Sequence, residues 1–423
     1  MKFQDLSKLQ LEEMFVGLQA EYALIKAEGL QLDMSRGKPS TDQLDISLGL
    51  LDELSSKSGT KAADGTDCRN YGNPDGITEF KAIYAQLLDV NPDNIIVCGN
   101  SSLSVMFDYI SQCMTHGAGS TPWMLQGKIK FLCPVPGYDR HFSILEYFGI
   151  EMINVPMLDD GPDMDLLEEL VKDSSVKGMF CVPKYSNPEG KTFSDTVVRR
   201  IAALKPAAPD FRIIWDNAYS EHHLYEKGDV LLNIFEQCEK HGSEDMIFAV
   251  GSTSKISFPG GGVSILVASD NNIVAIKKRL STQIICQDKL NQLRHARYFK
   301  SVQGVQLHMK RHARVLAPKF KVVLDALEKE LRGKGVAQWN NPNGGYFISL
   351  DVLDGCAKRT VELCLQAGVV LTPAGATYPY GVDPKDANIR IAPTFPPVEE
   401  LKVAVDLLCL AVKLAAVEKL LGK

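Results

Sequence analysis

The feature that most constrains the fold is a series of short apolar runs between residues 94 and 268, most of them separated by stretches with helical periodicity. Near-continuous apolar runs are typical of strands that are buried on both faces of a parallel sheet. Their alternation with helices predicts an α/β fold with a mostly parallel, seven-stranded sheet. The predicted strands cover residues 94–98, 129–133, 151–155, 177–182, 211–215, 246–250 and 264–268.

The two ends of the chain predict a second, smaller α+β domain. Apolar residues recur at helical spacing near the N-terminus, and strand-like runs alternate with helical stretches after a long helical segment rich in Lys and Arg. We expect a large domain over residues 50–312 and a small domain formed by residues 1–49 and 313–423. The elements predicted for the small domain and its connection are helices at 7–28, 302–332, 358–367 and 396–420 and strands at 344–351 and 387–392.

Composition and charge argue against several classes of protein. The net charge is −6 and Lys and Arg are dispersed, so we expect no nucleic-acid partner. The ten cysteines form no Cys-x-x-Cys pair, which favours buried thiols in a reducing, cytoplasmic compartment and no metal site. The N-terminus lacks the apolar core of a signal peptide, and charges interrupt the apolar stretch at 401–421, so we expect no membrane association.

Lys255 is the first candidate for chemistry. It lies in Gly-Ser-Thr-Ser-Lys-Ile-Ser-Phe-Pro-Gly-Gly-Gly (251–262), directly after the predicted strand at 246–250. A lysine on the turn that leaves a buried strand is poorly placed for a solvated charge, but it suits an amine that forms a Schiff base with a carbonyl carbon. Other candidates also follow predicted strands, at the sheet edge where α/β proteins bind ligands.

Four residues fit the ring of pyridoxal 5′-phosphate (PLP), a cofactor that such a lysine would hold. The carboxylate of Asp216 can pair with the ring nitrogen, although an aspartate at this place can also cap the next helix. Asn187 and Tyr219 can bond the ring hydroxyl, although Asn-Pro near a glycine also marks a turn. Tyr138 can stack on the ring or belong to the core.

The phosphate of PLP requires backbone N–H groups and hydroxyls at the start of a helix. Such a start is predicted after the strand at 94–98, where serines can also serve as an ordinary helix cap. The predicted phosphate ligands are Asn100, Ser101, Ser102, Ser252 and Ser254.

Arg390 is an arginine inside an apolar strand, Asn-Ile-Arg-Ile-Ala. A buried arginine requires an anionic partner, and its planar guanidinium binds carboxylates in a bidentate manner. We therefore predict that Arg390 binds the α-carboxylate of an amino acid.

Taken in order, these residues and their surrounding phrases resemble the fold-type I PLP-dependent aminotransferases of class I, from about residue 30 to the end. The divergent subgroup called type Ic aspartate aminotransferases is the most similar. The phrases that carry this resemblance are Ser-Arg-Gly-Lys-Pro-Ser (35–40), Arg-Asn-Tyr-Gly-Asn-Pro-Asp-Gly (69–76), Pro-Gly-Tyr-Asp-Arg-His (136–141), Ser-Thr-Ser-Lys-Ile (252–256) and Asp-Lys-Leu-Asn-Gln-Leu-Arg-His (288–295).

The resemblance implies a PLP-dependent transferase fold and a role for each matched residue. Lys255 would bind the cofactor and transfer the substrate proton, with Asp216 and Tyr219 completing the catalytic group. Tyr71 would reach the phosphate of the neighbouring subunit, which implies a homodimer with shared active sites. Gly37 would lie in a loop that closes over substrate, beside Asn187 and Arg390 in the substrate-binding group.

One departure from the family pattern concerns the phosphate. Most class I members carry an arginine eight residues after the lysine, and this chain has Val263 there. A phosphate dianion with one fewer cation is held less well unless another charge replaces it. We expect Lys289, from the same or the neighbouring subunit, to supply that charge, although it can also be a surface lysine.

The expected reaction moves an amino group between an amino acid, aspartate in the first instance, and 2-oxoglutarate by a ping-pong mechanism. A dicarboxylate needs a second cation, for which Arg140 and Arg36 are the candidates; each can instead form a structural salt bridge. A broader aromatic, kynurenine or 2-aminoadipate aminotransferase and a PLP-dependent β-lyase remain alternatives, because the same groups serve these reactions.

Overall fold

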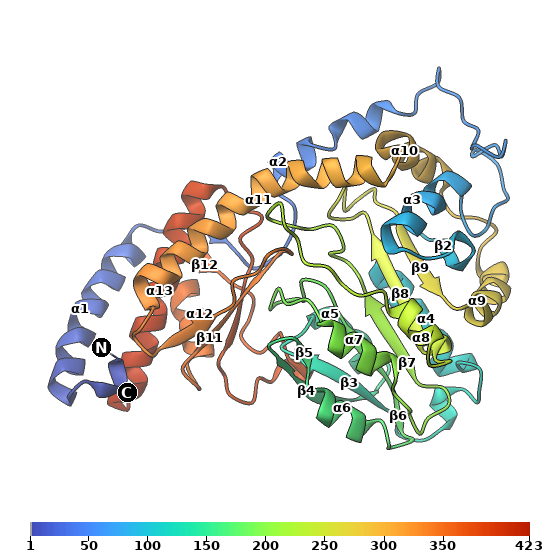
Figure 1. The fold of residues 1–423 in the computed structure, drawn as a ribbon. Coiled ribbons are helices and arrows are strands. Elements are labelled where there is room, and N and C mark those ends of the chain that lie inside the picture. The colour runs from blue at the N-terminus through green and yellow to red at the C-terminus, as the bar shows by residue number, and fades with distance from the viewer. Residues whose placement is uncertain (1) are drawn as a thin grey trace.

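The computed structural model describes residues 2–423 and contains one large sheet, two small sheets and thirteen α-helices over that range. Figure 1 shows the large sheet with helices around it, and the two chain ends together on the opposite side of the molecule. The helix α11 (Val302–Leu331) runs from one part to the other. The two parts are therefore joined by a continuous helix as well as by the N-terminal segment.

The large sheet confirms the α/β fold predicted from the apolar runs. Its strand order is β2-β9-β8-β7-β6-β3-β4-β5, and β3, β4, β6, β7 and β8 pair in parallel. All seven predicted runs form strands, and an eighth strand of two residues pairs with β4 at the edge. The strands are β2 (Ile95–Val97), β3 (Lys130–Val135), β4 (Glu151–Leu158), β5 (Gly161–Pro162), β6 (Val176–Cys181), β7 (Arg212–Asp216), β8 (Ile247–Ser252) and β9 (Ser264–Ala268).

The strands at the centre of this sheet are buried on both faces, which explains why they are mostly apolar, whereas β4, near the edge, exposes Glu151, Pro156 and Leu158. In β7, Ile213 and Trp215 pack in one cluster with α3, α7 and α10, whereas Ile214 packs in another with α4, α5 and α9. Successive side chains of a strand point to opposite faces, so a sheet covered on both sides needs apolar residues at every position. The helices around the sheet are α3 (Thr78–Leu88), α4 (Ser102–His116), α5 (Asp139–Tyr147), α6 (Met164–Leu170), α7 (Asp195–Ala202), α8 (Ile234–Glu239), α9 (Asp270–Gln283) and α10 (Lys289–Phe299).

The second part has its own core. The antiparallel sheet β10-β11-β13 packs with α1, α11, α12 and α13, and α1 lies beside α13 in Figure 1. Ser7 and Gln10 form a capping box that starts α1. The remaining elements are α1 (Lys8–Ala27), α2 (Thr41–Asp45), α12 (Ala357–Gln366), α13 (Val398–Leu421), β1 (Leu32–Asp33), β10 (Ala337–Trp339), β11 (Ile348–Val352), β12 (Val369–Val370) and β13 (Asn388–Ile391).

The predicted helices and strands of this part are all present, but the short helix α2 and three short strands (β1, β10 and β12) were not predicted. The predicted domain boundary at residue 312 falls inside α11, and Met1 of the predicted small domain lies outside the described residues. The division into 50–312 and the two terminal segments stays a prediction, since a helix that crosses a boundary does not mark it.

Candidate active site

The turn that carries Lys255 follows directly from β8. Ile256 and Ser257 both donate backbone hydrogen bonds to Thr253 O, at 2.9 and 2.7 Å, which closes the turn around the lysine. The Nζ of Lys255 lies 5.0 Å from the ring centre of Tyr219 and 5.5 Å from that of Tyr346. Burial lowers the pKa of Lys255 below its usual value; the Asp216 carboxylate opposes this shift and Arg390 adds to it. The lowered pKa favours the neutral amine more than on a surface lysine.

Asp216 closes β7, the strand next to β8, and it is almost completely buried. Its Oδ2 lies 3.0 Å from Nε2 of His141, whose ring stacks on Phe180 with centroids 4.5 Å apart. Its Oδ1 is also buried and makes no hydrogen bond to any residue in 2–423. A buried carboxylate oxygen without a donor is costly unless a bound group supplies one. The fixed Oδ2 and the unpartnered Oδ1 make Asp216 suited to a protonated ring nitrogen.

Arg390 lies in β13 and reaches from the second part toward the large sheet. Its Nη1 donates to Asp139 Oδ1 at 2.7 Å and to Asn187 Oδ1 at 3.3 Å. Its guanidinium lies 5.0 Å above the Phe347 ring, and Nε donates to Thr372 Oγ1 at 3.4 Å. The predicted pair Asn187 and Arg390 is thus brought together by the fold, with Asp139 as a partner that the sequence did not indicate.

Tyr138 and Tyr219 also lie in this group. Tyr138 is the N-cap of α5 and its ring meets that of His141 edge-on at 5.0 Å. Burial, followed by the nearby Asp216 carboxylate, raises the pKa of Tyr138 to about 12. Burial, followed by Tyr138 and Asp216, raises the pKa of Tyr219 well above its usual value. Both phenols are therefore proton donors and not phenolates at neutral pH.

The predicted phosphate ligands form a second cluster, at the start of α4. Ser252 Oγ lies 2.5 Å from Ser254 Oγ, and Ser254 Oγ donates to Asn100 O at 3.2 Å. Ser101 is the N-cap of α4 but its side chain makes no cap hydrogen bond. A helix start with hydroxyls beside it is an anion-binding arrangement, so Asn100, Ser101, Ser252 and Ser254, with Ser102 in the first turn, suit a phosphate.

Within residues 2–423, neither Tyr71 nor Lys289 makes a side-chain hydrogen bond to these two clusters. Tyr71 is 72% exposed, whereas Lys289 is buried and its Nζ donates to Gly72 O at 2.8 Å. Lys289 therefore holds the backbone beside Tyr71 within the same chain. Near Val263, a different cation is found: Arg294 Nη2 donates to Gly261 O at 3.4 Å, and its buried Nε makes no hydrogen bond within 2–423.

The segment with Arg36 and Gly37 packs beside Arg390. A Cβ on residue 37 would lie 2.3 Å from Cζ of Phe347, so a larger residue there would force the Phe347 ring to move. Thr372 Oγ1 donates to Ser35 O at 2.7 Å, which ties this segment to the Arg390 side chain. Arg36 and Arg140 are both exposed.

Sequence reasoning missed three contacts of this site: His141, Asp139 and Tyr346. His141 stands three residues after Tyr138, a spacing that places both on one side of a helix start, and this was the available signal. Asp139 carried no such signal, because a carboxylate in the first turn of a helix is common without any function. Tyr346 comes from a strand-like run in another part of the chain, so its proximity to Lys255 required the fold.

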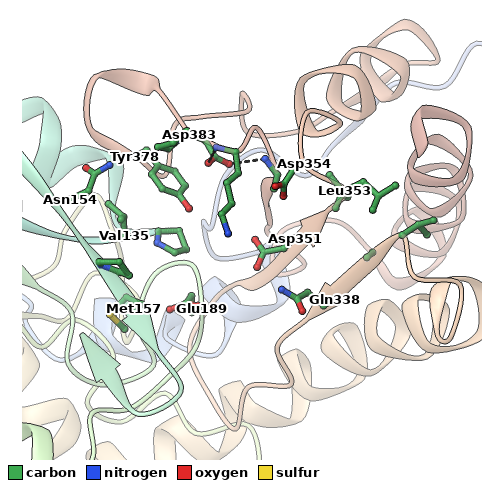
Figure 2. A pocket seen from close by; sticks show the side chains of 18 of the residues that line it. Val135, Asn154, Met157, Glu189, Gln338, Asp351, Leu353, Asp354, Tyr378 and Asp383 are labelled. Atoms are coloured by element: carbon green, nitrogen blue, oxygen red, sulfur yellow. Dashed lines mark hydrogen bonds between the residues drawn. The ribbon is translucent and has the colours of Figure 1, made fainter. Parts of the chain in front are cut away.

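A separate cavity of about 580 Å³ lies between the two parts, and none of the predicted site residues lines it. Figure 2 shows Glu189 and Asp351 facing this cavity from its two sides. Within residues 2–423 no cluster of His, Cys, Asp and Glu is arranged to hold a metal ion. Over the same range no helix combines the length and apolarity needed to cross a bilayer.

Comparison with known proteins defines the class to which this fold and site belong. The chain matches the family model described as aspartate amino-transferase over residues 6–423. An aspartate aminotransferase of Corynebacterium glutamicum is 49% identical over 396 residues, 93% of this chain and 91% of that protein. A putative aminotransferase of Mycolicibacterium smegmatis is 45% identical over 427 residues and covers 100% of both chains.

Solved structures agree with this assignment. The crystal structure of an aspartate transaminase from C. glutamicum superposes with a TM-score of 0.97 at 46% identity and covers 99% of each chain. A more distant structure, an α-aminoadipate aminotransferase of Thermus thermophilus solved with a phosphopyridoxyl-leucine compound, has a TM-score of 0.74 at 20% identity and shows the shared fold alone.

The fold and the match define a fold-type I aminotransferase of class I, as the motifs predicted. The chain belongs to the aspartate amino-transferase family and is an aminotransferase. Membership of this family implies PLP as the cofactor.

Proposed function

We propose that this aminotransferase binds PLP covalently through Lys255 and moves an amino group between aspartate and 2-oxoglutarate by a ping-pong mechanism. The observation that carries the proposal is Asp216, whose Oδ2 is fixed by His141 while the buried Oδ1 has no donor within 2–423. A protonated pyridine nitrogen would supply the missing donor, and the same carboxylate acts on Lys255, whose pKa it raises against the lowering effect of burial.

When bound, PLP supplies an electron sink that stabilises negative charge at the α carbon of an amino acid. Asp216 would keep the proton on the ring nitrogen, and Tyr219 and Asn187 would hold the ring oxygen. Lys255 would accept the proton from the α carbon of the substrate and return it in each half of the cycle. Its lowered pKa supports this role, because a general base must be unprotonated near neutral pH.

Arginines at two places in the proposed site favour a dicarboxylate substrate over an aromatic one. Arg390 would bind the α-carboxylate, and Arg140 or Arg36 would bind the side-chain carboxylate. Arg140 is two residues beyond Tyr138, and Arg36 is beside Gly37 in the segment tied to Arg390, so both are exposed cations at the margin of the site. The 49% identity to an aspartate aminotransferase favours the same choice.

We also propose a cytoplasmic homodimer. Tyr71 lies in a loop and is 72% exposed, and Leu48 and Leu51, on an earlier segment, are each about half exposed. Contact with a second copy would bury these apolar groups and bring Tyr71 to the partner's phosphate site. The ten cysteines are free within 2–423, and nine of them are buried, which supports a reducing compartment.

Single-turnover spectra test the reaction. We expect aspartate and glutamate to convert the absorbance of the bound cofactor to that of pyridoxamine phosphate, with release of the matching 2-oxo acid. Conversion by aromatic amino acids alone would favour the broader aminotransferase. Release of ammonia and pyruvate from a cysteine-type substrate would favour a β-lyase, and a protein that binds no cofactor would contradict the whole proposal.

A further inference from the structure

Arg390, the residue expected to bind a substrate carboxylate, is already paired with a carboxylate of the chain itself. Asp139 Oδ1 accepts from Arg390 Nη1 at 2.7 Å, the distance of a strong charge-assisted hydrogen bond. This pair joins α5, which covers the large sheet, to β13 of the small sheet. It is therefore a contact between the two parts of the molecule, made at the proposed substrate site.

Asp139 lies on the Nη1 side of the guanidinium, the side that also contacts Asn187. Nη1 donates to Asp139 and also to Asn187 Oδ1, and Asn187 is the residue proposed at the ring oxygen. Nη2 makes no hydrogen bond within residues 2–423, and Nε makes one long contact, 3.4 Å, with Thr372. A substrate carboxylate that binds Nη1 and Nη2 together would place one of its oxygens at Nη1, beside the carboxylate of Asp139. The two negative charges would repel each other, so Asp139 would have to leave this position.

The two partners differ in how firmly they are held. Arg390 has 8% of its side chain exposed, lies on the Phe347 ring and belongs to a paired strand. Asp139 has 32% exposed and is the first residue of α5, where the helix start stabilises a carboxylate without the arginine. An incoming carboxylate would therefore displace Asp139 and leave Arg390 in place.

We propose that Asp139 is a positioning residue that occupies the carboxylate-binding edge of Arg390 and is displaced by the α-carboxylate of each substrate. This inference rests on the proposed role of Arg390. Asp139 keeps a buried arginine paired between turnovers, and it weakens the binding of every substrate and product by the same competition. Removing its charge should tighten carboxylate binding and destabilise the protein that holds no carboxylate.

The test compares the wild-type holoenzyme with Asp139→Asn, using succinate as an unreactive dicarboxylate. We expect calorimetric titration to show a Kd for succinate about tenfold lower in the variant, since a hydrogen bond between charged groups is lost from the competing state. The Tm without succinate should fall and should return toward that of wild type at saturating succinate. KM for aspartate should fall while kcat changes less than about twofold.

Asp195→Asn is the matched control, because Asp195 is also the first residue of a helix and also pairs with an arginine, Arg199, at 3.0 Å. It should change neither the Kd for succinate nor KM. Asp139→Glu, which keeps the charge, should stay near wild type, and Asp139→Ser replaces Asp139→Asn if the latter does not fold. An unchanged or higher Kd in both neutral variants would overturn the inference.

Arg390→Lys separates this inference from the function on which it rests. If wild type binds succinate and Arg390→Lys loses that binding, the role of Arg390 stands, and the Asp139 variants decide the inference by themselves. If Arg390→Lys binds succinate as wild type does, the proposed carboxylate site is wrong, and the inference fails with it.

Discussion

Two sides of the candidate site differ in how completely one chain builds them. On the ring side, Asp216, Asn187 and Tyr219 are each at most 3% exposed, and His141 fixes the aspartate. On the open side, Tyr71 is 72% exposed, and Arg36 and Arg140 are exposed as well. The groups that would contact the cofactor ring are thus held in place before anything binds. The groups that would contact the phosphate in a partner subunit or the side chain of a substrate are exposed and are not held in this way.

This difference has a physical reason. A buried carboxylate needs fixed partners, because reorganisation in a low-dielectric interior is costly. An exposed arginine is hydrated by water and needs no fixed partner, and it can form an ion pair when a ligand brings a carboxylate. Substitutions on the ring side should therefore affect all substrates equally, and those on the open side should discriminate between ligands.

The largest effect should come from the ring side. Asp216→Ala removes the partner of the ring nitrogen, and we expect kcat/KM to fall about 10²–10³-fold for every amino acid. Steady-state kinetics with aspartate and with phenylalanine measure this, and Asp195→Ala serves as a surface control. A loss in kcat/KM of less than tenfold would show that Asp216 is not the essential partner of the ring nitrogen.

A second effect of burial should appear in stability. Glu189, two residues beyond Asn187, is 7% exposed; burial raises its pKa to about 7, with Lys191 opposing the shift. Because the folded pKa lies above the usual value of 4.5, this group favours folding fully below about pH 4.5, and that contribution is lost as pH rises through about 7. The loss amounts to about 3 kcal/mol at most.

The free energy of unfolding of Glu189→Gln, measured relative to wild type, should therefore increase as the pH is raised from 5 to 8. Denaturant unfolding of both proteins at the two pH values measures the difference, and the exposed Glu146→Gln should show no such trend. A difference between variant and wild type that is independent of pH would show that Glu189 is ionised throughout.

On the open side, Arg140→Met should discriminate between substrates. We expect kcat/KM for aspartate to fall about 10- to 100-fold, because the side-chain carboxylate loses its cation, while an aromatic donor changes little. Parallel assays with both donors check this. Equal losses for the two would contradict the assignment, and the same pair of assays on Arg36→Met would then identify the alternative arginine.

The smallest effect is expected at Lys289. Removing its hydrogen bond to Gly72 loosens the backbone beside Tyr71, so Lys289→Ala should raise the Kd of PLP by about tenfold. Fluorescence titration of the apoenzyme measures it, with the Lys300→Ala variant as control. Unchanged PLP binding would leave Lys289 with a purely structural contact.

The sequence was sufficient for seven of the eight strands of the large sheet, because strands buried on both faces form recognisable apolar runs, but the two-residue strand β5 was not predicted. The sequence also placed Asp216, Asn187 and Lys255 at the ends of neighbouring strands, where the fold brings them together. The sequence did not reveal the ion pair between Asp139 and Arg390, because these residues are 251 positions apart and lie in different parts of the molecule. The short strands β1 and β12 were missed for the same reason, since two-residue strands exist only through their pairing.

The central claim is that Lys255 is the residue that binds the cofactor covalently. Reduction of the PLP-loaded enzyme with sodium borohydride, followed by proteolysis and mass spectrometry, tests it directly. The account predicts a phosphopyridoxyl group on Lys255 in the peptide that contains Gly-Ser-Thr-Ser-Lys-Ile, and no such group in Lys255→Ala. Modification of another lysine, or of none, would contradict it.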